Sequence, residues 1–296
     1  IHLEGLIMKK VIHDCDNTMG VPQKDVDDGL ALLYLLGRED IDILGVTTTF
    51  GNSTIDIVHS NTESMFSELK LNDIPLVKGA GVNEDRRSDA AKFLLETVKK
   101  SPKEVSILAT GSLTNLYGAY LLDDKFFTYV KEIVIMGGIQ KPLVINNKIM
   151  NELNFASDAS AAYHVLKYGE NVAVVTGHLC LQALFGKETY DELMENPSNE
   201  VFKYIREKTL PWFNFIGPKY DVEGFYNWDV VAAVYLTNPE IFQDNKELIA
   251  SEEENYKTGL LKTSRDKEGY KVNIPKSIAD MKKFNSLVFE AWEQAF

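Results

Sequence analysis

The chain of 296 residues is long enough to bury a full core, as one large α/β domain or as two smaller ones. Hydrophobic residues make up 45% of it and charged residues 25%, as in ordinary globular proteins. Its net charge of -13 argues against a nucleic-acid partner, because phosphate binding needs clustered lysine and arginine, and favours small neutral or metal-assisted ligands.

Short β-branched runs alternate with amphipathic helical stretches, as in βαβ units that build a parallel sheet. The predicted strands are 10–13, 43–48, 75–78, 105–110, 132–136 and 171–176. The predicted helices between them are 28–37, 54–70, 88–100, 112–121 and 157–168, and Ser112 is placed to cap the fourth. We therefore predict an α/β fold with a Rossmann-like, mostly parallel sheet flanked by helices.

The alternation ends after Gly177, where residues 187–237 read as helices and loops rich in aromatic side chains. We interpret this stretch as a helical insertion near the active site. The tail predicts short strands at 246–250, 256–262 and 270–274 and a last helix at 277–295. Residues 1–7 precede a Met-Lys-Lys start at Met8, so we expect them to be an artificial extension and residues 8–296 to form a single domain.

The two cysteines, Cys15 and Cys180, give no disulfide framework and no CxxC pair. No apolar run approaches the ~20 residues that span a bilayer, and no signal peptide is visible. We expect a cytoplasmic protein with no membrane contact.

Four aspartates crowd the N-terminal part of the chain. Asp14 and Asp16 close the first predicted strand, and Asp27 and Asp28 open the first predicted helix. Open α/β sheets bind ligands at the carboxyl ends of their strands, and several acids held that close favour a cation among them. A hard divalent metal is the first hypothesis and catalysis around it the second. Solvated N-cap acids would explain Asp27 or Asp28, but not the pair that follows a strand.

Other strand ends carry polar side chains that suit a polyol. Thr47 to Asn52 follow the second strand, Thr110 to Asn115 the fourth, and Gly137-Gly138 the fifth. Further on, Glu152 and Asn154 fall on one side of the chain if that segment is extended. Each has a simpler explanation: a capping or turn role for Thr114-Asn115, a tight turn for the glycines, and N-capping for Asp229. His13 and His178 fit ordinary core or loop positions, and no zinc spacing is present.

Several of these motifs, in their order along residues 9–239, resemble the nucleoside hydrolase family of the inosine-uridine preferring type. They are Asp14-Cys15-Asp16, Asp27-Asp28, Gly45-Val46-Thr47-Thr48 with Gly51-Asn52, Ile135-Met136-Gly137-Gly138, Glu152-Leu153-Asn154-Phe155 and Trp228-Asp229.

The resemblance implies Ca²⁺-dependent hydrolysis of the N-glycosidic bond of ribonucleosides, giving ribose and a free nucleobase in nucleoside salvage. It implies a homodimer or homotetramer. The implied calcium ligands are Asp16, Asp28, Asp229 and the backbone carbonyl of Ile135, with Asp14 in support. Asp16 is also the implied general base for a metal-bound water. The implied ribose contacts are Asp27, Asn52, Glu152 and Asn154, with Asn146 at the 5′ end, while Trp228 meets the nucleobase.

The sequence departs from the family pattern at two points. Residues 17–26 separate Asp16 from Asp27, where the family has a compact Asp-x-Asp-Pro-Gly-x-Asp-Asp motif, so Asp25 competes for a ligand role. Position 228, often histidine in the family, is tryptophan here, as in its purine-preferring branch. Base preference and the leaving-group acid therefore stay open.

Two other classes of function remain. Asp14-Cys15-Asp16-Asn17-Thr18 also resembles the first motif of haloacid-dehalogenase-type phosphatases, in which Asp14 would be the nucleophile and Mg²⁺ the metal. That family should supply a late acidic pair after an apolar strand, and no convincing pair is present. A non-catalytic ribose-binding module is the third alternative, although binding a polyol does not require a metal-and-base cluster.

Overall fold

The computed structural model describes residues 8–296, and the predicted residues 1–7 lie outside the described part. Its centre is one sheet of eight strands. In spatial order these are β12 (Lys246–Ile249), β13 (Tyr270–Asn273), β8 (Val172–Val175), β5 (Glu132–Met136), β4 (Val105–Ala109), β1 (Lys9–Cys15), β2 (Ile41–Thr48) and β3 (Leu76–Val77). Every pair is parallel except β12 with β13. The predicted mostly parallel α/β fold is confirmed.

The chain leaves the middle of the sheet in both directions. It runs outward from β1 through β2 to β3, then returns to the other side of β1 and continues through β4, β5 and β8. The order therefore reverses between β1 and β4, and such a switch point opens a crevice at the carboxyl ends of the strands. Both elements that carry the first candidate motifs, the end of β1 and the start of the next helix, lie at this crevice.

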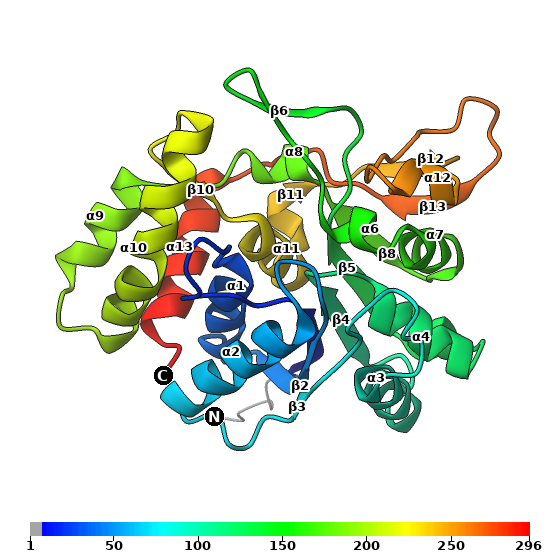
Figure 1. Ribbon diagram of the computed structural model, residues 1–296, viewed down its shortest axis with the longest axis horizontal. Coiled ribbons are helices and arrows are strands. Elements are labelled where there is room, and N and C mark those ends of the chain that lie inside the picture. The colour runs from blue at the N-terminus through cyan, green and yellow to red at the C-terminus, as the bar shows by residue number, and fades with distance from the viewer. Residues whose placement is uncertain (1–7) are drawn as a thin grey trace, which may run out of the picture.

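Helices cover both faces of the sheet (Figure 1). One face carries α1 (Asp27–Leu36), α2 (Ile55–Glu68), α11 (Trp228–Thr237) and α13 (Met281–Glu293), and the other carries α3 (Asp89–Lys100), α4 (Thr114–Leu122) and α7 (Ala159–Tyr168). Because side chains alternate along a strand, Val11 and Leu108 enter the first core whereas Ile12 and Ile107 enter the second. Two apolar layers thus hold the sheet between them.

Shorter elements and the predicted helical insertion surround the carboxyl edge. The hairpin of β6 (Leu143–Ile145) and β7 (Lys148–Met150) projects beyond the sheet (Figure 1). The insertion contains α9 (Lys187–Glu195) and the long α10 (Glu200–Tyr220), between β9 (Leu184–Gly186) and its antiparallel partner β10 (Gly224–Tyr226). The remaining elements are α5 (Phe126–Tyr129), α6 (Asn154–Ser157), α8 (Gly177–Cys180), α12 (Glu253–Tyr256), the 3₁₀ turn η1 (Pro239–Ile241), β11 (Phe242–Gln243) and β14 (Ser277–Ile278).

The prediction of a strand at 256–262 is wrong. Residues 253–256 form α12 instead, because Glu252 and Asn255 close a reciprocal capping box at its start. Gly259 then takes a φ of 72°, which ends any extended run. The last helix also begins later than predicted, at Met281, where the Asp280 side chain accepts a hydrogen bond from the Lys283 amide.

The predicted cap at Ser112 is wrong as well. Helix α4 begins at Thr114 after Leu113, and the Ser112 hydroxyl pairs with that of Thr49 at 2.7 Å. This hydrogen bond ties the ends of β2 and β4 together. Within residues 8–296, no helix is both long enough and apolar enough to cross a membrane.

Candidate active site

The aspartates of three separate segments meet at the switch point. Asp16 follows β1 directly, Asp27 and Asp28 begin α1, and Asp229 is the second residue of α11, so it does not act as that helix's N-cap. Carboxylate oxygens of Asp27, Asp28 and Asp229 lie within 4.8 Å of one another, and the Asp229 amide donates to Asp27 Oδ2 at 3.1 Å. All four side chains are buried. Tertiary packing of α1 against α11 creates this cluster.

Asn52 fixes the position of Asp16. The Asn52 amide donates to Asp16 Oδ2 at 2.6 Å, while its side-chain Nδ2 donates to Asp16 Oδ1 at 3.2 Å and to Asp28 Oδ2 at 3.4 Å. Glycine is needed beside this contact, because a Cβ added at Gly51 would lie 2.0 Å from Asp16 Oδ2. The loop after β2 therefore orients a carboxylate that follows β1.

Burial and mutual repulsion make this cluster costly to ionise. Desolvation raises the pKa values of Asp16, Asp27, Asp28 and Asp229, and the negative charges of neighbouring aspartates raise them further. The available donors are carboxylate oxygens, with backbone carbonyls close by, and oxygen donors of this kind suit a hard divalent cation such as Ca²⁺ or Mg²⁺. By charge and donor type, the cluster fits a cation.

Asp14 points away from this cluster into the sheet. Its Oδ1 accepts hydrogen bonds from the Thr47 hydroxyl at 2.5 Å and from Asn115 Nδ2 at 2.8 Å. Burial raises the pKa of Asp14 to about 7. Asp14 is not among the residues that line the cavity, so its carboxylate is badly placed to attack a phosphate ester. The geometry does not favour the phosphatase alternative.

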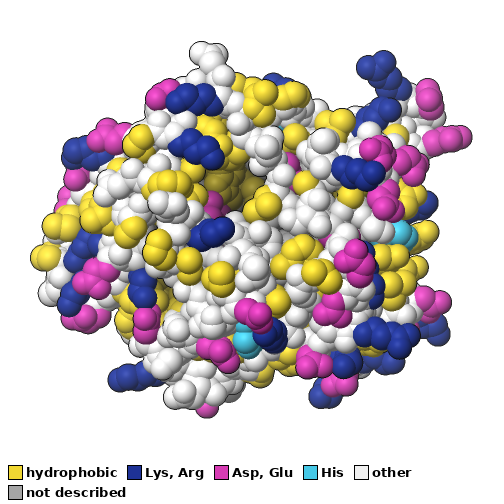
Figure 2. All heavy atoms as spheres, viewed as in Figure 1, with side chains coloured by type: hydrophobic (Ala, Val, Ile, Leu, Met, Phe, Trp, Pro, Cys, Tyr) yellow, Lys and Arg dark blue, Asp and Glu magenta, His cyan; other side chains and the backbone are white. Residues whose placement is uncertain are grey.

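A cavity of about 450 Å³ opens above the aspartates, and Figure 2 shows its mouth between apolar side chains. Four of the expected ribose contacts line it: Asp27, Asn52, Glu152 and Asn154. Trp228 and Asp229 line it as well. The structure thus brings the expected sugar-binding side chains and the metal-binding candidates to one cavity.

Backbone hydrogen bonds orient Glu152, which lies at the start of α6. Its carboxylate accepts from the amides of Gly138 at 3.1 Å, Phe155 at 2.9 Å and Ala156 at 2.9 Å. Asn154 begins that helix, so the segment is not extended, and its Nδ2 donates to the carbonyls of Thr110 and Met136. Both side chains still face the cavity, because a tight turn replaces the strand-like alternation.

Ile135 and Asn146 stand further out. Ile135 is the fourth residue of β5, paired with Ala109 of β4 and Val174 of β8. Asn146 sits at the tip of the β6–β7 hairpin, where its Nδ2 donates to the carbonyls of Tyr220 at 3.0 Å and Asp221 at 2.8 Å. The Asn146 amide therefore joins the hairpin to the end of α10 in this conformation.

Aromatic and apolar side chains form the upper wall. The ring of Trp228 lies 5.3 Å from that of Tyr226, measured between centroids, whereas Phe225 turns away to stack on Phe185. Helix α10 adds Trp212, Ile216 and Tyr220, which the sequence reasoning did not assign. Their spacing of four residues places them on one face of a helix and could have identified them. Within residues 8–296, the buried indole N–H of Trp212 has no hydrogen-bond partner.

The additional residues 17–26 are partly buried and do not form only an exposed loop at the cavity mouth. Asn17, Thr18 and Met19 are buried, and Lys24 Nζ donates to the Asn52 carbonyl at 2.9 Å. Asp25 lines the cavity near Asp27, which raises the Asp25 pKa further after burial itself. This segment therefore contributes a fifth carboxylate beside the cluster.

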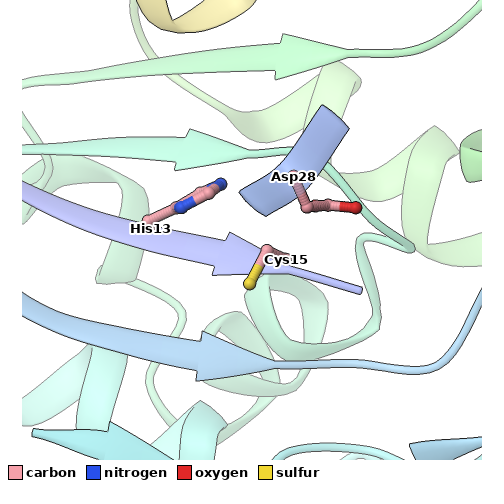
Figure 3. Close-up of side chains that lie close together, drawn as sticks. All are labelled: His13, Cys15 and Asp28. Carbon is pink, nitrogen blue, oxygen red and sulfur yellow. The ribbon is translucent and has the colours of Figure 1, made fainter. Parts of the chain in front are cut away.

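His13 and Cys15 of β1 point toward Asp28, with one potential ligand atom from each within 4.8 Å of the others (Figure 3). Burial raises the pKa of the Cys15 thiol well above its usual range and lowers that of His13 to about 3. The Nε2 of His13 is already paired with the Thr110 hydroxyl at 2.9 Å. A protonated thiol and an occupied imidazole nitrogen make this trio a poor site for a soft metal.

Comparison with known proteins agrees with this geometry. The family model described as inosine-uridine preferring nucleoside hydrolase matches residues 11–286. Uridine nucleosidase 1 of Arabidopsis thaliana is 29% identical over 257 residues, covering 77% of this chain and 75% of the relative. The inosine-uridine preferring nucleoside hydrolase of Crithidia fasciculata is 27% identical over 205 residues, covering 60% and 62%.

The solved structure of a purine-preferring ribonucleoside hydrolase from Gardnerella vaginalis has the same fold. It superposes with a TM-score of 0.83 at 19% identity, covering 97% of this chain and 99% of that one. Fold, cavity and family match agree: this chain belongs to the inosine-uridine preferring nucleoside hydrolase family and is an N-glycosyl hydrolase.

Proposed function

We propose that this chain hydrolyses the N-glycosidic bond of ribonucleosides with the help of Ca²⁺, giving ribose and a free nucleobase. The observation that carries the proposal is the single cavity in which the buried aspartates lie below the side chains suited to a sugar. Family membership supports the same reaction class.

Asp16, Asp28 and Asp229, with the main-chain carbonyl of Ile135, would hold the cation. Their donors are all oxygen, which Ca²⁺ prefers, and their crowding makes a divalent charge favourable. When bound, Ca²⁺ supplies Lewis acidity that lowers the pKa of a water molecule.

Asp16 acts as the general base. Its carboxylate is held by two hydrogen bonds from Asn52, so its orientation is set before substrate binds. It accepts a proton from the attacking water as the new C–O bond forms at the anomeric carbon. The C–N bond breaks, its electron pair leaves with the nucleobase, and positive charge develops on the sugar as in glycoside hydrolysis.

Asp27, Asn52, Glu152 and Asn154 orient the ribose through its hydroxyls. Glu152 is suited to this role, because three backbone amides already fix its carboxylate. Preorganisation of this kind can supply several kcal/mol, about 7 or more in favourable models.

Trp228 stacks against the leaving base, with Tyr226 and Trp212 beside it. Stacking of a base on an aromatic ring contributes about 1–3 kcal/mol and tolerates different bases. Relatives of this chain are named for uridine in one case and for purines in another, so both base classes belong in the test.

The test is a panel of purine and pyrimidine ribonucleosides, assayed for free ribose with Ca²⁺ and with excess chelator. We expect ribose release in Ca²⁺ and its loss in chelator, with Asp16→Asn as the inactive control. Full activity in metal-free protein would contradict the cation's role. Phosphate release from sugar phosphates, with no ribose from any nucleoside, would favour the phosphatase alternative. Binding of nucleosides without hydrolysis would favour a ribose-binding module.

A further inference from the structure

A chain of hydrogen bonds runs from the core of the sheet to Asp28. His13 Nε2 lies 2.9 Å from the Thr110 hydroxyl, which lies 2.7 Å from Asp28 Oδ1. All three residues are buried, and Figure 3 shows His13 on β1 directed toward the helix that carries Asp28. The three residues come from β1, from the end of β4 and from the start of α1, so the chain crosses the switch point of the sheet.

The geometry sets the direction of each hydrogen bond. The Thr110 hydroxyl has one hydrogen, and the Asp28 carboxylate at 2.7 Å is a closer and stronger acceptor than the Asp14 carbonyl at 3.4 Å. Thr110 therefore donates to Asp28 and accepts from the N–H at His13 Nε2. This assignment leaves His13 Nδ1 as a bare acceptor, and within residues 8–296 it has no hydrogen-bond partner.

Packing alone does not explain a histidine here. A buried acceptor without a partner costs stability, whereas an apolar side chain in the same space would carry no such cost. The pKa of His13, lowered to about 3 by burial, agrees with a ring that stays neutral and carries a single N–H. That N–H serves Thr110.

We propose that His13 is a positioning residue that acts through Thr110 on Asp28, and so sets the affinity of the site for its cation. The inference rests on the proposed function, which makes Asp28 a cation ligand. With the His13 N–H in place, the Thr110 hydroxyl cannot turn its hydrogen toward the core, so it holds Asp28 in one orientation. Groups that orient metal ligands in this way are commonly worth 10- to 100-fold in metal affinity.

Calorimetric titration of chelator-treated protein with Ca²⁺ alone tests the proposal. His13→Phe keeps a flat ring but lacks the N–H, and we expect it to weaken Ca²⁺ binding about 10-fold. His13→Gln, whose side-chain amide can donate from nearly the same place as Nε2, should restore most of that affinity. Thermal unfolding in chelator provides the fold control, and His13→Leu replaces His13→Phe if the larger ring prevents folding.

A double-mutant cycle separates this chain of contacts from two independent effects. Thr110→Val removes the hydroxyl and should weaken Ca²⁺ binding about 10- to 100-fold, while Thr110→Ser should keep most of the affinity. Once Thr110→Val is present, His13→Phe should cost little more, because its effect passes through that hydroxyl.

Three outcomes would overturn the inference. Wild-type affinity in a folded variant without the N–H would show that His13 does not act on the site. Full additivity of the two substitutions would show that it does not act through Thr110. In both cases the proposed function would stand, whereas failure of the wild type to bind Ca²⁺ at all would overturn both together.

Discussion

Removal of the cation should make the stability of this protein fall as pH rises. Burial raises the pKa of Asp14 from 3.8 to about 7, so between those values the folded chain binds a proton that the unfolded chain has released. The free energy of unfolding must then decrease with pH across that window. For Asp14 alone the change corresponds to ~4 kcal/mol at one pKa unit per 1.36 kcal/mol.

The neighbouring carboxylates act in the same direction, and one histidine opposes them. The pKa values of Asp16, Asp28 and Asp229 are also raised, chiefly by burial. His13 has its pKa lowered from 6.5 to about 3, so its contribution is lost as pH falls through that range and offsets about one aspartate below pH 6.5. We therefore expect the steepest loss of stability above pH 6.5.

Calorimetric unfolding at pH 5, 6.5 and 8, in excess chelator and in excess Ca²⁺, measures this effect. The chelated protein should have its lowest Tm at pH 8, and Ca²⁺ should raise Tm more at pH 8 than at pH 5. At 1,000 times its Kd, a ligand adds ~4 kcal/mol. Asp14→Asn cannot ionise and should show a shallower decline. A chelated Tm that is flat or rises from pH 5 to pH 8 would refute the reasoning.

Three further predictions concern catalysis. Asp16→Asn and Asp229→Ala should each lose about 100-fold or more in kcat at saturating Ca²⁺ while the chain unfolds at a similar temperature, and near wild-type turnover would remove that residue from the mechanism. Trp228→Ala should lower kcat/KM by about 5- to 150-fold and change the ranking of purine and pyrimidine nucleosides; an unchanged ranking would place the base elsewhere. A 2′-deoxynucleoside should react on the order of 10⁴ times more slowly, because the missing hydroxyl leaves Asp27 or Glu152 unpaired, and comparable rates for the two sugars would argue against these contacts.

The sheet could be predicted because its signals are local. Buried parallel strands are short β-branched runs, and all six predicted strands appear with their ends shifted by no more than two residues. The strand predicted at 256–262 failed for a local reason as well, since the capping box of Glu252 and Asn255 outweighs the apolar pair that follows. Competing side-chain hydrogen bonds were underestimated there.

The cavity was predictable only in part, because residue type and tertiary placement are separate problems. Asp27, Glu152 and Trp228 belong to recognisable motifs and do meet in one cavity. Trp212 has no such motif, and its place above the site depends on how α10 packs across the crevice. The oligomeric state and the cytoplasmic location stay predictions.

The same crowding that costs stability at the switch point is what gives the site its affinity for a cation. Asp27 and Asp28 lie in the first turn of α1 and Asp229 in the first turn of α11, so two helix N-termini face the cluster. A helix N-terminus favours a carboxylate by about 0.3–1 kcal/mol, up to ~2 in partly buried settings. That is less than the ~4 kcal/mol that burial imposes on Asp14 alone, so the helix dipoles cannot offset the repulsion. The fold therefore holds its ligands in an arrangement that is unfavourable without a divalent ion, and cation binding recovers that free energy where the chemistry takes place.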